Sequence, residues 1–154
     1  MDKHTINAVL RKYFRLSWRG HHGAPHWARV CINAKILAQK EGANTKVAHY
    51  FGLFHDMARA SEYTDDGHGL RSATLLKSLG GADFLKLTDD EFAELCDAMA
   101  LHSDHQPTGT ITQKVCWDAD RLDLWRIGIM PDPDRLFTES ARQLHFERLG
   151  NGYY

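Results

Sequence analysis

The sequence predicts an all-α fold, a helical bundle with about six to seven helices in 154 residues. Two observations lead to this prediction. Apolar residues recur at spacings of three and four in most segments, which is typical of helices with one buried face. Runs that alternate apolar and polar residues, as half-buried strands do, are lacking. The connections between the segments are short, so we expect a single domain over 1–154.

The first half of the chain contains three predicted helices. The polar, amphipathic segment 4–16 predicts the first. The second, over 26–40, has an apolar stripe made of Trp27, Val30, Cys31, Ala34, Leu37 and Ala38. The third, over 44–59, has a stripe made of Val47, Ala48, Phe51, Phe54 and Ala58. Asn44 precedes this stripe, and because its side chain can accept hydrogen bonds from free backbone N–H groups, we expect it to be the N-cap.

The second half of the chain contains four more predicted helices. The stripe over 68–79 consists of Ser72, Leu75, Leu76 and Leu79, and that over 89–102 of Phe92, Leu95, Cys96 and Met99. The stripe over 111–126 consists of Val115, Cys116, Ala119 and Leu122, and that over 134–148 of Phe137, Ala141 and Leu144. Thr88 and Glu91 are three residues apart just before an apolar run, which predicts a capping box.

Composition excludes several classes of protein. Apolar residues make up 43% and charged residues 25% of the chain, which is typical of a globular domain. No apolar run approaches the roughly 18 residues of a membrane span, so we expect no membrane partner. The net charge of −1 gives no strong signal for nucleic-acid binding. The three cysteines are far apart and form no CxxC pair, so we expect a reducing, cytoplasmic location.

Metal-competent side chains lie on the apolar faces of five predicted helices. They are His26, His55, His68, His102 and Asp120. A single histidine on such a face is more often a hydrogen-bonded core residue. Burying an unpartnered ionisable group costs several kcal/mol, and five such groups, all His or Asp, are satisfied together by one shared divalent cation.

Asp56 directly follows His55 and adds a carboxylate to this set. Neighbouring residues on a helix are about 100° apart, so both side chains can reach one ion as adjacent ligands. The HExxH pattern of zinc proteases, which places two histidines four residues apart, is absent. The arrangement therefore predicts a different kind of metal site.

Four sequence strings resemble the HD-domain superfamily of metal-dependent phosphohydrolases. They are HGAPHWARV (22–30), FGLFHDMAR (51–59), GHGLRSA (67–73) and WDADRLDL (117–124). The resemblance covers about 20–130, which would form the core, with the N-terminal and C-terminal helices packed on it. It implies that four residues bind one divalent metal: His26, His55, Asp56 and Asp120. The Ala-Asp-Arg-Leu context favours Asp120 over Asp118 as the last ligand.

Some members of this superfamily bind two metals through additional histidines. His68 and His102 occupy positions similar to those, and His105 is a further candidate. We expect one ion and keep two as the alternative. In the other interpretation, His68 and His102 contact phosphate or water. The ligand types are compatible with Mn, Fe, Ni, Co, Zn or Mg, and the sequence does not discriminate among them.

Three residues are predicted to act in catalysis. Asp56 could serve as general base toward a metal-activated water. Arg59 and Arg71 follow ligand positions by one helical turn, and guanidinium groups bind phosphate oxygens in pairs. Arg29 is a weaker candidate for the same role, since it can equally be a solvated helix residue. His21 and His22 lie in a Gly-rich loop that forms either a lid or a surface turn.

The resemblance implies a phosphohydrolase that cleaves a small phosphate ester or nucleotide with metal-activated water as nucleophile. Two alternatives stay open: a dinuclear non-haem iron redox enzyme of the same fold, and a non-catalytic HD binding module. P-loop and GxSxG patterns are absent, which removes other common enzyme classes. We expect a small phosphorylated substrate as partner, and the sequence leaves open whether the chain forms a homo-oligomer.

Overall fold

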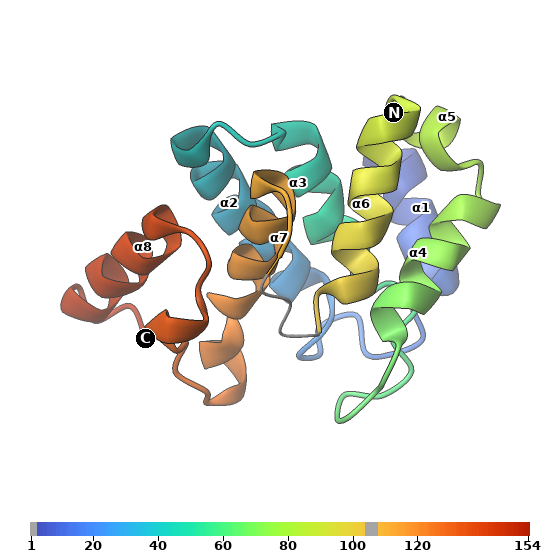
Figure 1. Cartoon of the computed structure of the whole chain (residues 1–154). Helices are drawn as coiled ribbons and strands as arrows, with labels where there is room; N and C mark the ends of the chain where they lie inside the picture. Colours follow the sequence, from blue (N-terminus) through green and yellow to red (C-terminus); the bar gives the residue numbers. More distant parts are fainter. Residues whose placement is uncertain (1–2, 104–107) are drawn as a thin grey trace.

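Eight α-helices and two short 3₁₀ helices make up the part of the chain that the computed structural model describes, residues 3–103 and 108–154 (Figure 1). The α-helices are α1 (Lys3–Tyr13), α2 (Ala24–Glu41), α3 (Thr45–Phe54), α4 (His68–Ser78), α5 (Gly81–Leu85), α6 (Asp89–Leu101), α7 (Ile111–Arg121) and α8 (Glu139–Gly150). The 3₁₀ helices are η1 (Leu124–Ile127) and η2 (Pro133–Arg135). These residues contain no strand, so the predicted all-α fold is confirmed. None of the described helices combines the length and the apolar character needed to cross a bilayer.

The predicted caps are present, whereas several helix boundaries differ from the prediction, among them the end of α7, which lies at Arg121 instead of 126. The Asn44 side chain accepts hydrogen bonds from the first backbone N–H groups of α3, and Thr88 and Glu91 form the capping box of α6. Helix α3 ends at Phe54 because the chain tightens into i→i+3 turns, in which Arg59 N donates to Asp56 O at 3.0 Å. Helix α8 begins at Glu139 instead of 134, and the short helix α5 was not predicted.

Helix α3 lies centrally and packs against α2, α6 and α7, while α4 packs along α6 (Figure 1). The apolar stripes predicted from the sequence meet in this core, where the side chains of Leu37, Phe51, Met99 and Trp117 are fully buried. Trp117 Nε1 donates a hydrogen bond to Ala98 O at 3.0 Å, which satisfies the polar atom of the largest core side chain. The packing brings the ends of five helices, α2, α3, α4, α6 and α7, to one region of the bundle.

A glycine allows α4 to approach α6 closely. A Cβ atom at Gly69 would lie 2.0 Å from Met99 O and 2.8 Å from the His102 ring, distances that no real side chain tolerates. Because Gly69 follows the first residue of α4, this contact joins the start of α4 to the end of α6. It therefore positions His68 beside His102.

The carboxylate of Asp118 connects α7 to α8. It accepts hydrogen bonds from the backbone N–H groups of Phe137 and Thr138, both at 2.8 Å, and from Thr138 Oγ1 at 2.7 Å. Thr138 is in turn the N-cap of α8. Burial raises the pKa of Asp118, although these hydrogen bonds partly offset the rise. All of the contacts of this carboxylate are therefore structural.

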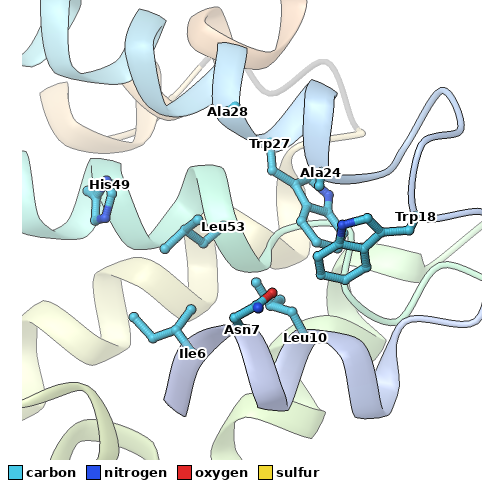
Figure 2. Close-up of a pocket in the computed structure, with 9 residues that line it drawn as sticks. All are labelled: Ile6, Asn7, Leu10, Trp18, Ala24, Trp27, Ala28, His49 and Leu53. Carbon is cyan, nitrogen blue, oxygen red and sulfur yellow. The ribbon is translucent and has the colours of Figure 1, made fainter. Parts of the chain in front are cut away.

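An apolar cavity of about 280 Å³ lies between α1 and the pair α2 and α3 (Figure 2). Its lining consists of Ile6, Asn7, Leu10, Trp18, Ala24, Trp27, Ala28, His49 and Leu53. The rings of Trp18 and Trp27 meet edge to face with their centroids 5.4 Å apart. None of the predicted metal ligands or catalytic residues lines it, so this cavity is separate from the predicted site.

Candidate metal centre

Five helices contribute a cluster of His and Asp side chains at their ends, which we call the His–Asp cluster. Its members are His26 in the first turn of α2, His55 and Asp56 directly after α3, His68 at the start of α4, His102 directly after α6, and Asp120 in the last turn of α7. All are buried except Asp120, which is half-buried. The structure thus brings all six residues predicted as metal ligands into one place.

Four of these residues form a first group of donor atoms. His26 Nε2 lies 3.1 Å from His55 Nε2, 3.3 Å from Asp120 Oδ1 and 3.7 Å from Asp56 Oδ2. His55 Nε2 lies 3.6 Å from Asp56 Oδ2 and 3.7 Å from Asp120 Oδ1. Ligand atoms about 2.1 Å from one ion are about 3.0–3.4 Å apart at octahedral and tetrahedral angles. The spacing of the first group therefore fits a single divalent ion.

The other oxygen of Asp56 belongs to a second group of donors. Asp56 Oδ1 lies 3.1 Å from His68 Nε2 and 3.6 Å from His102 Nε2, and the two nitrogens are 2.8 Å apart. His26, His55 and Asp56 on one side, and Asp56, His68 and His102 on the other, each place their ligand atoms within 4.8 Å of one another. Asp56 thus contributes one carboxylate oxygen to each group of donors.

Hydrogen bonds at the Nδ1 atoms orient all four imidazole rings. His55 Nδ1 contacts Phe51 O at 3.1 Å, and His102 Nδ1 contacts Met99 O at 2.7 Å. His68 Nδ1 contacts Asp65 O at 2.6 Å, and His26 Nδ1 contacts an Asp123 carboxylate oxygen at 2.7 Å. Carbonyl and carboxylate oxygens only accept, so each Nδ1 carries the proton, and in the neutral ring Nε2 is left as a bare acceptor.

The cluster contains more hydrogen-bond acceptor atoms than there are protons for them to bind. Two Nε2 atoms face each other in the His26–His55 pair at 3.1 Å and in the His68–His102 pair at 2.8 Å, and in the second pair Arg59 Nη1 also lies 3.0 Å from His68 Nε2. Among the described residues, the buried Asp56 Oδ1 has no hydrogen-bond partner. Facing acceptors repel unless a proton or a cation lies between them. The donor set therefore fits divalent metal ions.

The electrostatics of the cluster favour the binding of a cation. Burial lowers the pKa of His55 to about 3, so its ring is neutral at physiological pH. Burial raises the pKa of Asp56 and of Asp120, but the surrounding imidazoles outweigh it and hold both carboxyls below their usual range. Burial lowers the pKa of His26 and His102, yet their neighbouring carboxylates raise it overall. Both shifts reflect an excess of negative charge, which attracts a cation.

The sequence patterns did not single out Asp123, whose carboxylate contacts His26 of the first group at the ring nitrogen that faces away from the other donor atoms. Besides accepting from His26 Nδ1, its buried carboxylate accepts from Arg29 Nε at 2.6 Å and Arg29 Nη2 at 3.1 Å. Arg29 was a candidate for binding phosphate, but the structure pairs it with Asp123 instead. The available signal was the third Asp of WDADRLDL, one helical turn after Asp120. A carboxylate behind a ligating histidine fixes its tautomer and raises its basicity.

Replacing Asp123 with Asn is expected to weaken metal binding by about 10- to 100-fold, the usual effect of losing such a partner. The amide keeps the shape of the side chain but removes the charge that His26 and Arg29 share. Competition between the protein and a chromogenic chelator for Mn or Zn measures the affinity. Asp97→Asn, at an exposed position on α6, is the matched control. Equal affinities in the two variants would contradict the assigned role.

The cluster opens into two connected cavities. The inner cavity, about 200 Å³, is lined by His22, Asp56, Arg59, His68, His102, Ser103, Asp120, Leu124, Arg126 and Ile127. The outer cavity, about 630 Å³, is lined by His21, His22, Arg59, Glu62, Tyr63, Thr64, Arg126 and Ile127. The residues common to both are His22, Arg59, Arg126 and Ile127. A ligand in the outer cavity can therefore reach the His–Asp cluster past two guanidinium groups.

The two arginines predicted to bind phosphate have different surroundings. Arg59 lines both cavities, and its Nη1 lies 3.0 Å from His68 Nε2 and 3.8 Å from Asp56 Oδ1. Arg71 contacts the carboxylate of Asp65 and donates to Asp66 O at 2.8 Å, and it is not among the residues described as lining either cavity. Arg71 thus holds the loop before α4, and its predicted role in catalysis stays a prediction.

Arg126 provides a second guanidinium group, beside that of Arg59, in the lining of both cavities. It was not singled out from the sequence, because it follows the last ligand by six residues and lies in η1, outside the periodic part of α7. Its Nε donates to His21 O at 2.7 Å, and its Nη1 donates to Asp123 O at 3.1 Å. These bonds hold its guanidinium at the boundary of the two cavities.

The Gly-rich loop was predicted to be either a lid or a surface turn. His22, which lies in this loop, fits neither description. Its side chain is buried, lines both cavities and lies 2.7 Å from Glu62 Oε2 through its Nδ1 atom. Burial lowers the pKa of His22, although Asp56 and Glu62 oppose the shift. The other open candidate, His105, lies outside the described residues.

Comparisons with known proteins agree with this architecture. The chain is similar to a predicted HD superfamily hydrolase from an uncultured Thermotogales bacterium, with 25% identity and a TM-score of 0.76, over 98% of this chain and 87% of that one. No family model matches the sequence.

Ribonuclease Y sequences are also similar. Those of Rubrobacter xylanophilus and Syntrophotalea carbinolica are each 26% identical, over 88% and 96% of this chain. The chain spans about a quarter of the length of these relatives, 25% and 26% respectively. The helical fold, the His–Asp cluster and the structural similarity over nearly the whole chain all match an HD superfamily structure.

Proposed function

We propose that the protein is a metal-dependent phosphohydrolase that cleaves a small phosphate ester or a nucleotide. One observation carries this proposal: two groups of bare donor atoms share Asp56 and lie beneath a cavity lined by Arg59 and Arg126. Anionic ligands for a cation on one side and guanidinium groups on the other match the two requirements of phosphoryl transfer. The similarity to an HD superfamily hydrolase supports the same conclusion.

The His–Asp cluster would hold the metal. His26, His55, Asp56 and Asp120 provide the first set of ligands, and Asp56 with His68 and His102 provides a second. The distances in the second group support a second ion beside the single ion that the sequence predicts. A divalent ion bound there supplies a water of lowered pKa near neutral pH and neutralises charge on the phosphoryl group.

The protein side chains would orient the substrate and move the proton. Arg59 and Arg126 can bind the non-bridging phosphate oxygens in pairs, since both guanidinium groups line the inner cavity. When only the first group holds an ion, Asp56 Oδ1, which has no hydrogen-bond partner among the described residues, can accept a proton from the attacking water.

A second candidate substrate is a phosphodiester in RNA. The similarity to Ribonuclease Y favours it, and the outer cavity of about 630 Å³ leaves room for more than a phosphate group. The composition, in contrast, gives no strong signal for nucleic acid. Phosphomonoesters and short RNAs therefore belong in the same activity screen.

Metal removal tests the proposal. Protein purified without chelator is expected to contain one or two divalent ions per chain and to hydrolyse members of a phosphate-ester panel with Mn, Co, Ni, Fe, Zn or Mg. Chelation and His55→Ala should both abolish activity, whereas the control His4→Ala, at an exposed position of α1, should retain it.

Three outcomes would contradict the proposal. Wild-type rates in His55→Ala would show that hydrolysis does not depend on the cluster. Inactivity with every metal and ester, in a metal-containing protein, would favour a binding module. Two irons per chain, with a mixed-valent signal and dioxygen uptake, would favour the redox alternative.

A further inference from the structure

An exposed aromatic ring stands at the wall of the outer cavity. Tyr63, between α3 and α4, is 86% exposed, the largest value among the large apolar and aromatic side chains described as exposed. It lines the outer cavity together with Arg59, Arg126 and Ile127, but it does not line the inner cavity. Tyr63 is therefore near the two arginines and farther from the His–Asp cluster.

The backbone that carries this ring is held by several hydrogen bonds. Arg59 Nη2 donates to Tyr63 O at 2.7 Å, and Tyr63 N donates to Ser61 Oγ at 3.0 Å. Ala60 N donates to the Asp65 carboxylate at 2.6 Å, and Arg71 contacts the same carboxylate. A ring on such a fixed backbone loses little conformational entropy when it contacts a ligand.

Arg59 connects the ring to the cluster. Its Nη2 holds the Tyr63 carbonyl, while its Nη1 lies 3.0 Å from His68 Nε2. From the cluster outward, a ligand would therefore meet carboxylates and imidazoles, then two guanidinium groups, and then Tyr63. A phosphate followed by a short polar spacer and a flat ring has the same order of groups.

We propose that Tyr63 is a specificity-determining residue that stacks on a flat aromatic ring in the leaving group of the substrate, as a nucleobase would, while Arg59 and Arg126 hold the phosphate. This inference rests on the proposed phosphohydrolase function and selects ring-bearing esters over simple aliphatic ones. Stacking on an aromatic side chain depends on the face of the ring and tolerates different bases. Tyr63 would therefore favour the class of nucleotides without selecting one base.

A pair of substrates that differ only in the base tests this role. Adenosine 5′-monophosphate and ribose 5-phosphate share the phosphate and the sugar. We expect the wild-type protein to show the higher kcat/KM on the nucleotide. Tyr63→Ala should lower this value by roughly 5- to 150-fold, the range for one stacked base, and leave ribose 5-phosphate unchanged. The loss should be in KM rather than kcat, because stacking stabilises the bound substrate and the transition state equally.

Two further variants separate stacking from a structural role. Tyr63→Phe keeps the ring and should retain the preference, while Phe146→Ala removes another exposed ring, on α8, and should have no effect. A preference for the nucleotide that survives in Tyr63→Ala, or an equal loss on both substrates, would overturn the inference and leave the phosphohydrolase proposal intact.

A binding measurement covers the case in which neither ester is hydrolysed. Calorimetric titration of the same protein with adenosine 5′-monophosphate and ribose 5-phosphate then reports the contribution of the base directly. Tighter binding of the nucleotide in the wild type, lost in Tyr63→Ala and kept in Tyr63→Phe, supports stacking even if the hydrolytic function fails. Equal binding of both compounds would overturn it.

Discussion

Replacing Asp56 with Asn is expected to abolish hydrolysis and to lower the metal content of both donor groups at once. The two oxygens of Asp56 face different groups, Oδ2 toward His26 and His55 and Oδ1 toward His68 and His102. An amide has only one oxygen and a nitrogen that does not ligate, so one group loses a donor and both lose negative charge. Removing a residue that only hydrogen-bonds to a ligand typically lowers metal affinity by up to about 100-fold, and we expect a larger loss here because Asp56 is itself a ligand.

Metal analysis and chelator competition measure this effect, with the fold checked by circular dichroism. His68→Ala is the informative comparison, because it removes a donor from the second group alone. It should lower the metal content to that of the first group, whereas Asp56→Asn should lower both. Wild-type metal content in folded Asp56→Asn would show that Asp56 is not a shared ligand, and Asp97→Asn serves as the unaffected control.

Replacing Asp118 with Ala is expected to destabilise the protein by about 3 kcal/mol and to leave the metal content unchanged. The substitution removes the acceptor of three hydrogen bonds and leaves the N–H groups of Phe137 and Thr138 without it at the start of α8. An unsatisfied buried donor costs about 1–3 kcal/mol. For a chain of this size, each kcal/mol lowers Tm by roughly 2–4 °C, so the shift should be about 6–12 °C.

Replacing Asp120, the neighbouring carboxylate on α7, is expected to give the opposite result, a loss of metal with little loss of stability. Asp120→Asn should lower the metal content of the first group with a smaller effect on Tm, since Asp120 contacts the cluster and not α8. Thermal unfolding and metal analysis of both variants, prepared in parallel, give four values. A loss of metal in Asp118→Ala that exceeds its loss in Asp120→Asn would reverse the assignment of the two residues.

The sequence by itself determined the helical class, most helix positions and the residues that the structure gathers into the His–Asp cluster. These features follow from local rules. A period of 3.6 residues identifies the buried face of a helix, and the side chains of Asn44 and Thr88 cap helices through contacts within three residues. A polar residue on a buried face is visible in the same pattern, and so His26, His55 and Asp120 could be selected without coordinates.

Only the tertiary structure decided which side chains hold those residues in place and which arginines surround them. Asp123 meets Arg29 across 94 positions of the sequence, and Arg126 reaches His21 across 105, so no local spacing indicates either contact. Arg71 shares the helical spacing of Arg59 relative to a ligand position, yet the turn before α4 directs it to Asp65. The physical reason is that periodicity specifies which face of a helix is buried, whereas the partners of a polar side chain depend on how the helix ends meet in three dimensions.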